Sequence, residues 1–200
     1  MSSERPPRLS YEESCKFLQR YYHLGMGAES VIPPMPDHRP DCDGEDGVRF
    51  FRTWVGVGRP FGLKPLRPED DVEVAEHALD NLTLPRTFFG RSEISSISFK
   101  NSDLSESTLC WNDFIEVNFT DADLSESDLR ASIFRRVAFV RTTLRNADLR
   151  CSSFEACDFT DADMAGAKLT RKQGERIHLS DEQRKVIDWQ ESDGDEPPGG

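Results

Sequence analysis

The central part of the sequence predicts a four-sided β-solenoid, and three observations lead to this prediction. Large apolar side chains occupy every fifth position from Phe89 to Leu169 without interruption. The residue two places before each of them is small or β-branched. Residue types then repeat every twenty positions. A period of five fits neither the 3.6 residues of a helical turn nor the 2.0 of a strand, so each group of five must form one side of a coil.

The five-residue period defines the predicted core. All seventeen positions of the series hold Leu, Ile, Met or Phe, in a chain with 36% hydrophobic residues. The three remaining positions of each pentad are mostly polar and are expected to face solvent. We therefore expect these side chains to form a dry interior: Phe99, Phe114, Phe119, Leu124, Leu129, Phe134, Phe139, Leu144, Leu149, Phe154 and Phe159.

The twenty-residue period sets the shape of the coil. Phe99, Phe119, Phe139 and Phe159 are twenty residues apart, and the other core positions form three similar series. Stacking of like side chains at one side of successive coils would select this pattern, so four pentads make one coil. The series predicts a little over four coils. At a spacing of about 4.8 Å between coils, the rod would be roughly 20 Å long.

Several pentads resemble a known repeat. The triplets Ala122-Asp123-Leu124, Ala147-Asp148-Leu149 and Ala162-Asp163-Met164 are similar to the A(D/N)LXX unit of pentapeptide-repeat proteins. The resemblance covers about residues 87–170. It implies a right-handed quadrilateral β-helix, and the handedness rests on the resemblance alone. We accordingly expect the repeat domain to span residues 85–171.

The N-terminal segment 1–84 lacks the five-residue period and is interpreted as a cap on the first coil. Residues 10–24 favour a helix, with Ser10 as N-cap and Glu13 in the capping-box position. Residues 69–82 favour a second helix, because their apolar residues have helical spacing. Residues 50–55 could form a short strand or a hydrophobic plug, within a stretch rich in Pro and Gly.

The C-terminal segment 172–200 is predicted to close the other end of the solenoid. Residues 180–189 favour a helix that begins at the N-cap Ser180, with Gln183 in the capping-box position. The last ten residues form an acidic tail that we expect to be disordered. Three apolar residues could cover the last coil or pair with a second copy of the chain in a homodimer: Val186, Ile187 and Trp189.

Composition excludes several classes of function. The chain has 37 acidic and 25 basic residues and a net charge of −12, which disfavours direct nucleic-acid binding and permits a basic protein partner. No signal peptide opens the sequence, and no apolar run approaches the length of a membrane span. The five cysteines lack metal-binding spacing. We expect free thiols in the cytoplasm, with no metal and no cofactor.

Six arginines at outward positions around the third coil form the best candidate binding surface, which we call the arginine girdle. Guanidinium groups bind carboxylates or phosphates bidentately, so the girdle could recognise an acidic partner. Alternatively, each arginine could pair with an acidic residue one coil away, because a separation of twenty positions means a neighbour in space. The girdle consists of Arg130, Arg135, Arg136, Arg141, Arg145 and Arg150.

Three functions are consistent with the sequence. The first is a non-enzymatic scaffold that binds a protein partner through charged solenoid faces. The second comes from the resemblance, because some acidic pentapeptide-repeat proteins protect DNA gyrase by mimicking duplex DNA, and members that dimerise do so through a C-terminal element. The third is an enzyme in residues 1–84, although no catalytic constellation is evident there. We favour the scaffold.

Overall fold

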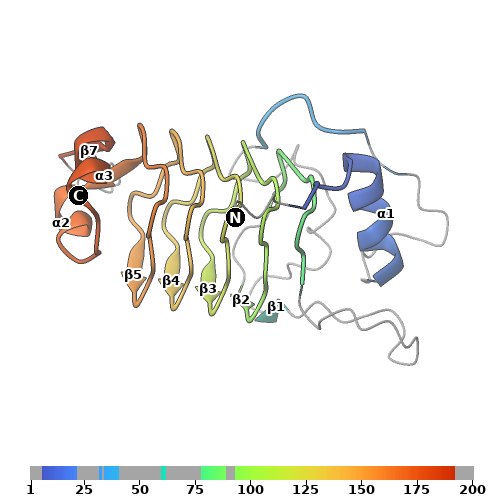
Figure 1. Ribbon diagram of the computed structural model, residues 1–200, viewed down its shortest axis with the longest axis horizontal. Coiled ribbons are helices and arrows are strands. Elements are labelled where there is room, and N and C mark those ends of the chain that lie inside the picture. The colour runs from blue at the N-terminus through green and yellow to red at the C-terminus, as the bar shows by residue number, and fades with distance from the viewer. Residues whose placement is uncertain are drawn as a thin grey trace, which may run out of the picture.

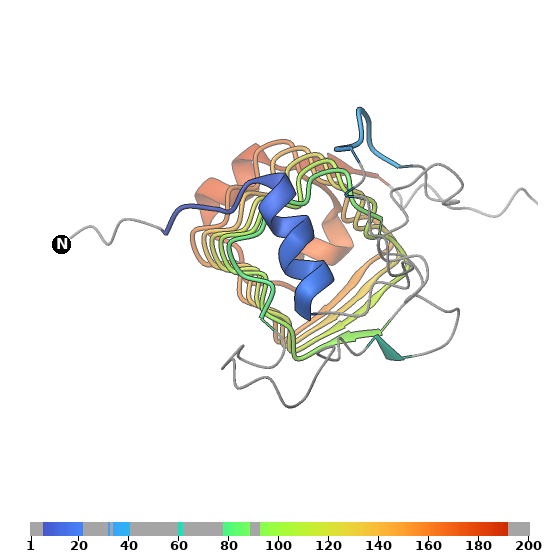
Figure 2. The same cartoon turned by 90° about the vertical axis from the view of Figure 1, so that its right-hand side faces the viewer.

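The computed structural model describes residues 6–21, 32, 34–40, 60–61, 78–88 and 93–191. It shows the predicted four-sided solenoid, with one coil stacked on the next along the long axis (Figures 1 and 2). Short parallel strands line one side of the coils. The helices and strands are α1 (Tyr11–Tyr21), β1 (Pro60–Phe61), β2 (Glu93–Ser95), β3 (Asp113–Ile115), β4 (Ile133–Arg135), β5 (Ser153–Glu155), β6 (Lys168–Thr170), α2 (Arg171–Gly174), α3 (Asp181–Val186) and β7 (Asp188–Gln190).

The register between coils is twenty residues, as the sequence predicts. Ile94 pairs with Phe114, and Phe114 pairs with Phe134, in the parallel sheet of order β1-β2-β3-β4-β5. Isolated parallel bridges connect the other three sides at the same step, for example from Ser98 to Asn118 and from Asp103 to Asp123. Each coil therefore satisfies its backbone groups on the coils before and after it.

The solenoid is longer than the sequence indicated. One side carries an unbroken ladder of bridges that advances by twenty residues at each of five steps, which at about 4.8 Å per coil corresponds to roughly 24 Å. The extra step joins Lys168 to Asp188 of the C-terminal cap, which the five-residue count did not include. The ladder runs through Phe88, Thr108, Asp128, Asp148, Lys168 and Asp188.

The solenoid begins before residue 85, so the predicted helix over residues 69–82 is wrong for its described part. Ala78 bridges to Ser98 and Thr83 bridges to Asp103. Asn81 has a φ of 61°, which no helix interior adopts. Leu79 is fully buried and belongs to the five-residue series. The helix was predicted because the apolar spacing of this stretch also matches a helix. Residues 69–77 lie outside the described residues, as does the segment 50–55.

Stacked phenylalanines fill the core on two sides of the coil. The ring centroids of Phe114 and Phe134 are 5.0 Å apart with an interplanar angle of 1°. Phe119 stacks on Phe99 in the next series, at 5.3 Å. Rings of the two series meet edge to face, a geometry that stabilises the core beyond the effect of burying the rings. Of the predicted core residues, Phe154 is half-buried and the other ten are buried.

Several small inward residues bury a hydroxyl group that forms a hydrogen bond to a backbone carbonyl. Ser127 Oγ donates to the Leu104 carbonyl at 2.9 Å, and Thr142 Oγ1 donates to the Phe119 carbonyl at 2.7 Å. Ser152 makes the equivalent bond to Leu129 at 2.8 Å. A buried hydroxyl without a partner is costly, so these bonds explain why serine and threonine are tolerated in the interior.

Each corner of the coil is turned by a residue in the left-handed conformation. Positive φ angles of 52–61° recur at intervals of five residues in the described part of the solenoid, from Asn81 to Asp161. Gly166 continues the series with a φ of 71°. Non-glycine residues adopt this conformation at a cost of about 1–2 kcal/mol each, so the stacking between coils must outweigh a repeated local strain.

The helix α1 closes the N-terminal end of the solenoid (Figure 2). The predicted capping box is present, because Ser10 N donates to Glu13 Oε2 at 2.8 Å and Glu13 N donates to Ser10 Oγ at 3.2 Å. Cys15 and Leu18 of this helix are buried in the same core as the solenoid. The helix ends at Tyr21, and residues 22–24 of the predicted span lie outside the described residues.

Two glutamines of the C-terminal cap satisfy carbonyl groups of the solenoid. Gln173 of α2 donates to Leu149 and Ser152, and Gln183 of α3 donates to Phe159 and Ala162, all through their side-chain amides. Gln183 also forms the predicted capping box with Ser180. Helix α2 was not predicted from the sequence. The glutamine amides thus donate to carbonyl groups that would otherwise accept backbone N–H groups of a further coil.

The predicted helix over residues 180–189 ends early. Helix α3 stops at Val186, and Trp189 lies in β7, where it pairs with Leu169. The reason is the twenty-residue register, which the chain resumes after the cap. Trp189 is half-buried and donates from Nε1 to the Arg184 carbonyl at 2.9 Å, and Ile187 is buried, whereas Val186 is 48% exposed. Residues 192–200 of the tail lie outside the described residues.

Truncation of a stacked ring should destabilise the solenoid strongly. Replacing Phe134 by Ala removes a fully buried ring with partners on both faces, Phe114 and Phe154, and we expect a loss of about 3–5 kcal/mol in the free energy of unfolding. Denaturant titration followed by circular dichroism measures it. Ile133→Ala is the matched control, because the adjacent side chain is 41% exposed. Equal losses in the two variants would contradict the stacked core.

Candidate partner-binding surface

The six arginines of the girdle are all engaged by carboxylates in the structure. Four of them pair with an acidic residue on a neighbouring coil, and two pair within their own coil. The described geometry thus corresponds to the alternative in which the girdle is internally paired. The pairs are Arg130–Asp128 (2.8 Å), Arg135–Glu155 (2.9 Å), Arg136–Glu116 (2.8 Å), Arg141–Asp121 (2.7 Å), Arg145–Asp163 (2.7 Å) and Arg150–Asp148 (2.7 Å).

The most enclosed of these charges form a ladder of two aspartates and two arginines. Arg130 grips Asp128 with two hydrogen bonds and also lies 3.9 Å from Asp148. Arg150 grips Asp148 in the same bidentate manner, at 2.9 and 2.7 Å. The Asp148 carboxylate also accepts the Arg150 backbone N–H. Burial raises the pKa of Asp148, but the bonds and charges of Arg150 and Arg130 together hold the pKa below its usual value.

Other aspartates of the repeat have the same structural role. Asp123 Oδ1 accepts the backbone N–H of Ser125 at 2.9 Å, and Asp103, Asp158 and Asp163 each accept the N–H two residues ahead. This is the Asx-turn, which an aspartate or asparagine supports at the start of a corner. The aspartate of the A(D/N)LXX unit is therefore explained by the corner that follows it.

The remaining girdle arginines lie on the exposed surface. Arg136 reaches back one coil to Glu116, whereas Arg135 reaches forward one coil to Glu155. Arg145 reaches forward to Asp163 on the next coil. Exposed pairs of this kind contribute about 0–1 kcal/mol each, and they can exchange partners readily.

Two exposed apolar residues were missed by the sequence analysis. Trp111 is 55% exposed and Ile133 is 41% exposed. Trp111 N donates to the Arg130 carbonyl, and Ile133 N donates to the Asn112 carbonyl, so the two residues lie on adjacent coils at one corner. The available signal was a large apolar residue at an outward position of its pentad, where the neighbouring pentads hold polar residues.

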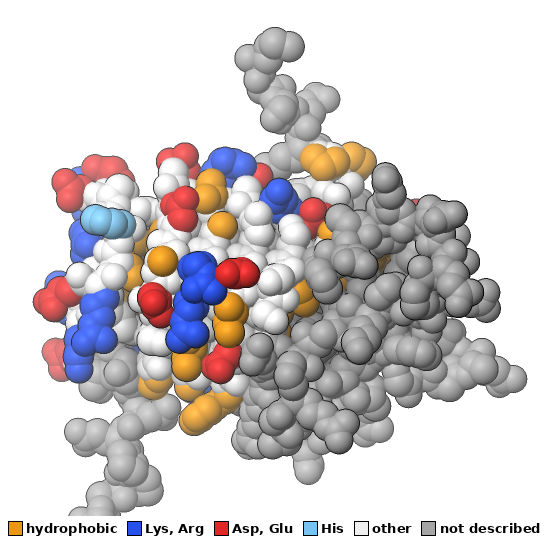
Figure 3. All heavy atoms as spheres, turned by 90° about the horizontal axis from the view of Figure 1, so that it is seen from below, with side chains coloured by type: hydrophobic (Ala, Val, Ile, Leu, Met, Phe, Trp, Pro, Cys, Tyr) orange, Lys and Arg blue, Asp and Glu red, His pale blue; other side chains and the backbone are white. Residues whose placement is uncertain are grey.

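Trp111 is unusual among the corner residues for the size of its side chain as well as for its exposure. It occupies a left-handed corner position, with a φ of 60°, where a bulky residue is a genuine outlier. Figure 3 looks at the side of the molecule on which β2–β5 lie and shows hydrophobic side chains among the charged ones. We call Trp111 and Ile133, with the neighbouring Arg130 and Arg135, the Trp111 corner.

A segment from outside the repeat lies against another corner of the solenoid. Pro36 accepts a hydrogen bond from Arg86 Nη1 at 2.8 Å, and Pro40 accepts one from Thr108 Oγ1. Arg39 donates to the Glu126 carbonyl at 2.8 Å. Residues 34–40 therefore cover a strip along successive coils. These residues therefore cover part of the charged solenoid surface that the sequence analysis assigned to solvent.

The described part of the chain contains four of the five cysteines. Cys15, Cys151 and Cys157 are not in disulfides, but Cys110 is disulfide-bonded, so the expectation that all the cysteines are free thiols is wrong. Burial raises the pKa of Cys15 to about 11. No group of three His, Cys, Asp or Glu residues among those described could hold a metal ion. Within the same residues, no helix has the length and apolar character needed to cross a bilayer.

The fold and its repeat define a class of protein, the parallel β-solenoids with five-residue sides. A family model of pentapeptide repeats matches eight copies in this chain, over residues 92–130 and 139–171. Over these residues the solenoid is similar to pentapeptide-repeat proteins, whose fold is the right-handed quadrilateral β-helix. The family is one of structural repeats, and no catalytic family is indicated. No curated protein matches the chain.

Solved structures with the same repeat are similar over part of their length. Rfr23 from the cyanobacterium Cyanothece 51142 is 22% identical, over 43% of this chain and 58% of its own, with a TM-score of 0.42. A pentapeptide-repeat protein of the Arabidopsis thaliana thylakoid lumen is 28% identical over 55% of this chain and 72% of its own (TM-score 0.30). QnrB1, a plasmid-mediated fluoroquinolone resistance protein, is 14% identical over 56% of this chain and 58% of its own (TM-score 0.27). The chain thus spans less than three fifths of Rfr23 and of QnrB1.

The cluster of Asp128, Arg130, Asp148 and Arg150 predicts a loss of stability in acid. Because Asp148 has a lowered pKa in the folded protein, its contribution is complete above the unfolded value of about 3.9 and is lost as pH falls through the folded pKa. Asp148→Asn keeps the Asx-turn acceptor but cannot ionise. We expect the free energy of unfolding to fall less between pH 5 and pH 3 in this variant than in the parent. Asp161→Asn, at an exposed position, is the control, and equal pH dependence in all three proteins would refute the assignment.

Proposed function

We propose that the protein is a non-catalytic scaffold that binds a protein partner through the charged outer surface of its solenoid. The contact centres on the Trp111 corner. The supporting observation is the exposed Trp111 side chain, held by a strained backbone on a rigid coil. The proposal extends the scaffold hypothesis from a charged face in general to one corner with an apolar centre.

The character of Trp111 supports a contact of this kind. Tryptophan and arginine are the residues most enriched among those that dominate binding energy in protein interfaces. A tryptophan in the left-handed conformation costs about 1–2 kcal/mol relative to a relaxed backbone, and its exposure shows that burial in this chain does not offset the cost. Because the other corner residues share this conformation, the exposure of the large aromatic side chain is what supports a contact here.

The arginines around this corner supply the charged rim. Arg135 lies two residues from Ile133 on β4 and pairs with Glu155. Arg130 contributes the carbonyl that accepts the Trp111 N–H. A guanidinium held by one carboxylate still has N–H groups that can bind an acceptor on a partner. The girdle therefore enters the proposal as a rim, with its internal pairs intact or exchanged.

The DNA-mimic hypothesis has less support. A mimic of duplex DNA needs an uninterrupted negative surface, whereas six arginines neutralise carboxylates across the middle coils. It also needs an end-to-end homodimer to reach the length of one helical turn of DNA, about 34 Å. Of the three residues considered for a homodimer, Val186 is the exposed one. A DNA gyrase supercoiling assay with and without the protein tests this alternative directly.

An enzyme in residues 1–84 is not proposed. The described part of this segment behaves as a covering for the solenoid, because α1 buries Cys15 and Leu18 in the shared core. Ser14 Oγ accepts the Thr83 backbone N–H at 2.8 Å, which joins the helix to the coil. These contacts favour the interpretation of the segment as an N-terminal cap.

Removal of the two apolar side chains should abolish partner capture without unfolding the protein. In the variant Trp111→Ala/Ile133→Ala, we expect capture of the partner to fall by about 30-fold or more, which corresponds to about 2 kcal/mol. The partner is first identified by photocrosslinking from a probe at Ser153 in the parent protein, and binding is then measured by isothermal titration calorimetry. The melting temperature should remain unchanged, because both side chains are exposed.

Two further variants make this test specific. Val186→Ala removes an exposed apolar side chain at the C-terminal end and should leave binding unchanged. Arg135→Gln/Arg136→Gln/Arg141→Gln should weaken binding less than the apolar pair and make it less sensitive to salt. Unchanged capture by Trp111→Ala/Ile133→Ala would refute the proposal. Loss of binding in the arginine variant alone would place the contact on the girdle instead.

A further inference from the structure

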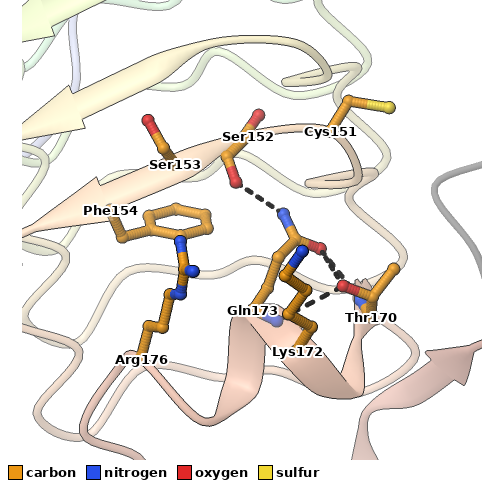
Figure 4. A pocket seen from close by; sticks show the side chains of 8 residues that line it. All are labelled: Cys151, Ser152, Ser153, Phe154, Thr170, Lys172, Gln173 and Arg176. Atoms are coloured by element: carbon orange, nitrogen blue, oxygen red, sulfur yellow. Dashed lines mark hydrogen bonds between the residues drawn. The ribbon is translucent and has the colours of Figure 1, made fainter.

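A pocket of about 180 Å³ lies where the last full coil meets the C-terminal cap. Figure 4 shows its lining, with the Arg176 side chain extending from the cap toward the Phe154 ring and the Lys172 side chain lying beside Gln173. The remaining lining residues come from the corner before β5 and from the start of the cap. They are Cys151, Ser152, Ser153, Thr170 and Gln173.

The pocket occupies the end of a stack of aromatic rings. Phe114, Phe134 and Phe154 stack at centroid distances of 5.0 and 5.2 Å with nearly parallel planes. The next residue in the series, one coil further on, is Gly174 of α2, which has no side chain to continue the stack. Phe154 is accordingly half-buried, unlike the two rings before it. The pocket presents the side of the last ring that has no aromatic neighbour in the series.

The cations of the pocket differ from those of the girdle. All six girdle arginines have a carboxylate within 4 Å, whereas neither Lys172 nor Arg176 forms an ion pair with any residue in the described part of the chain. Both are exposed at the rim of the pocket. On a chain with a net charge of −12, these two cations lie beside one concave site without an ion-pair partner among the described residues.

The floor of the pocket is rigid and its polar groups are satisfied. The Gln173 amide donates to the Leu149 and Ser152 carbonyls at 2.8 and 2.7 Å, and its oxygen accepts the Thr170 N–H at 2.9 Å. Ser152 Oγ donates to Leu129. These bonds fix α2 against the coil that carries Phe154. The groups left to meet a ligand are the ring, the two cations and the exposed Ser153.

We propose that this pocket binds an aromatic ring that carries an anionic substituent, such as a phosphate, sulfate or carboxylate. The ring stacks on Phe154 and extends the aromatic series by one member, in the offset geometry that aromatic pairs prefer. The anion binds Lys172 and Arg176, whose side chains suit a compact charge and a bidentate contact respectively. The volume suits a single substituted ring and excludes a drug-sized ligand. This site is independent of the proposed partner contact at the Trp111 corner.

Three probes separate the two halves of the proposed recognition. Phenyl phosphate carries both the ring and the anion, inorganic phosphate carries the anion alone, and phenol carries the ring alone. Titrations of the full chain are followed by ¹H–¹⁵N NMR chemical shifts. We expect phenyl phosphate to bind at least tenfold more tightly than either inorganic phosphate or phenol. Its shifts should map to the residues that line the pocket.

Variants of the pocket assign each half to its residues. Lys172→Gln/Arg176→Gln should weaken phenyl phosphate at least tenfold, and the charge-matched control Lys185→Gln/Arg145→Gln should change it less than twofold. Phe154→Leu should remove the preference for phenyl phosphate over inorganic phosphate. Because loss of the ring can destabilise the coil, Ser153→Tyr serves as a second variant, which fills the pocket from an exposed strand position and should also prevent binding of phenyl phosphate.

The affinities of these probes and variants distinguish the proposed site from a general attraction of anions to cations. Equal affinity for phenyl phosphate and inorganic phosphate, or equal loss in the pocket and control variants, would show general attraction to cations and overturn the proposal. A peptide that contains phosphotyrosine or sulfotyrosine supplies the same chemistry from a protein chain. Tighter binding of such a peptide than of phenyl phosphate would identify a modified side chain as the source, and equal binding would favour a free small molecule.

Discussion

The contact between one coil and the next is the constraint on which the whole structure depends. No single coil encloses enough apolar surface to be stable, so every inward side chain is buried by its counterpart twenty residues away. The stacked rings of Phe114 and Phe134 show this contact in its simplest form. The same contact aligns the backbone ladders on all four sides and holds a left-handed residue at each corner against its local preference. Both caps are explained by the need to end this stacking, since α1 covers the first coil and two glutamines satisfy carbonyl groups at the last.

The same period organises the outer surface. Because side chains twenty positions apart are neighbours, an arginine on one coil meets an aspartate or glutamate on the next, and the girdle becomes a set of ion pairs. The charged surface is therefore largely balanced within itself. Departures from this balance carry the most information about function. The Trp111 corner has an apolar centre where polar residues are usual, and the pocket beside Phe154 has two cations that form no ion pair within the described residues.

The repeat could be predicted from the sequence because its signal is redundant: seventeen positions and their twenty-residue alignment all indicate one coil. The prediction failed where two periods coincide, as at Leu79 and Leu82, whose spacing fits a helix as well as a pentad. It failed at Trp189 because strand pairing with Leu169 depends on a partner across the cap. The pairing of the girdle stayed open because sequence does not determine whether a side chain such as Arg145 leans to the coil before or after it. The pocket was invisible because it depends on α2, a four-residue helix with no periodic signal.

Because all coils have the same height, the number of coils between two sites sets their separation along the axis. Trp111 and Cys151 occupy the same corner position two coils apart, the first at the centre of the partner contact and the second at the rim of the pocket. Duplication of any twenty residues between them would separate the two sites by one further increment of about 4.8 Å along the axis without rotating either to another side. An insertion of five or ten residues would instead move them to different sides. Gene duplication, or a designer, could thus adjust the distance between two binding sites in equal steps while their relative orientation is kept.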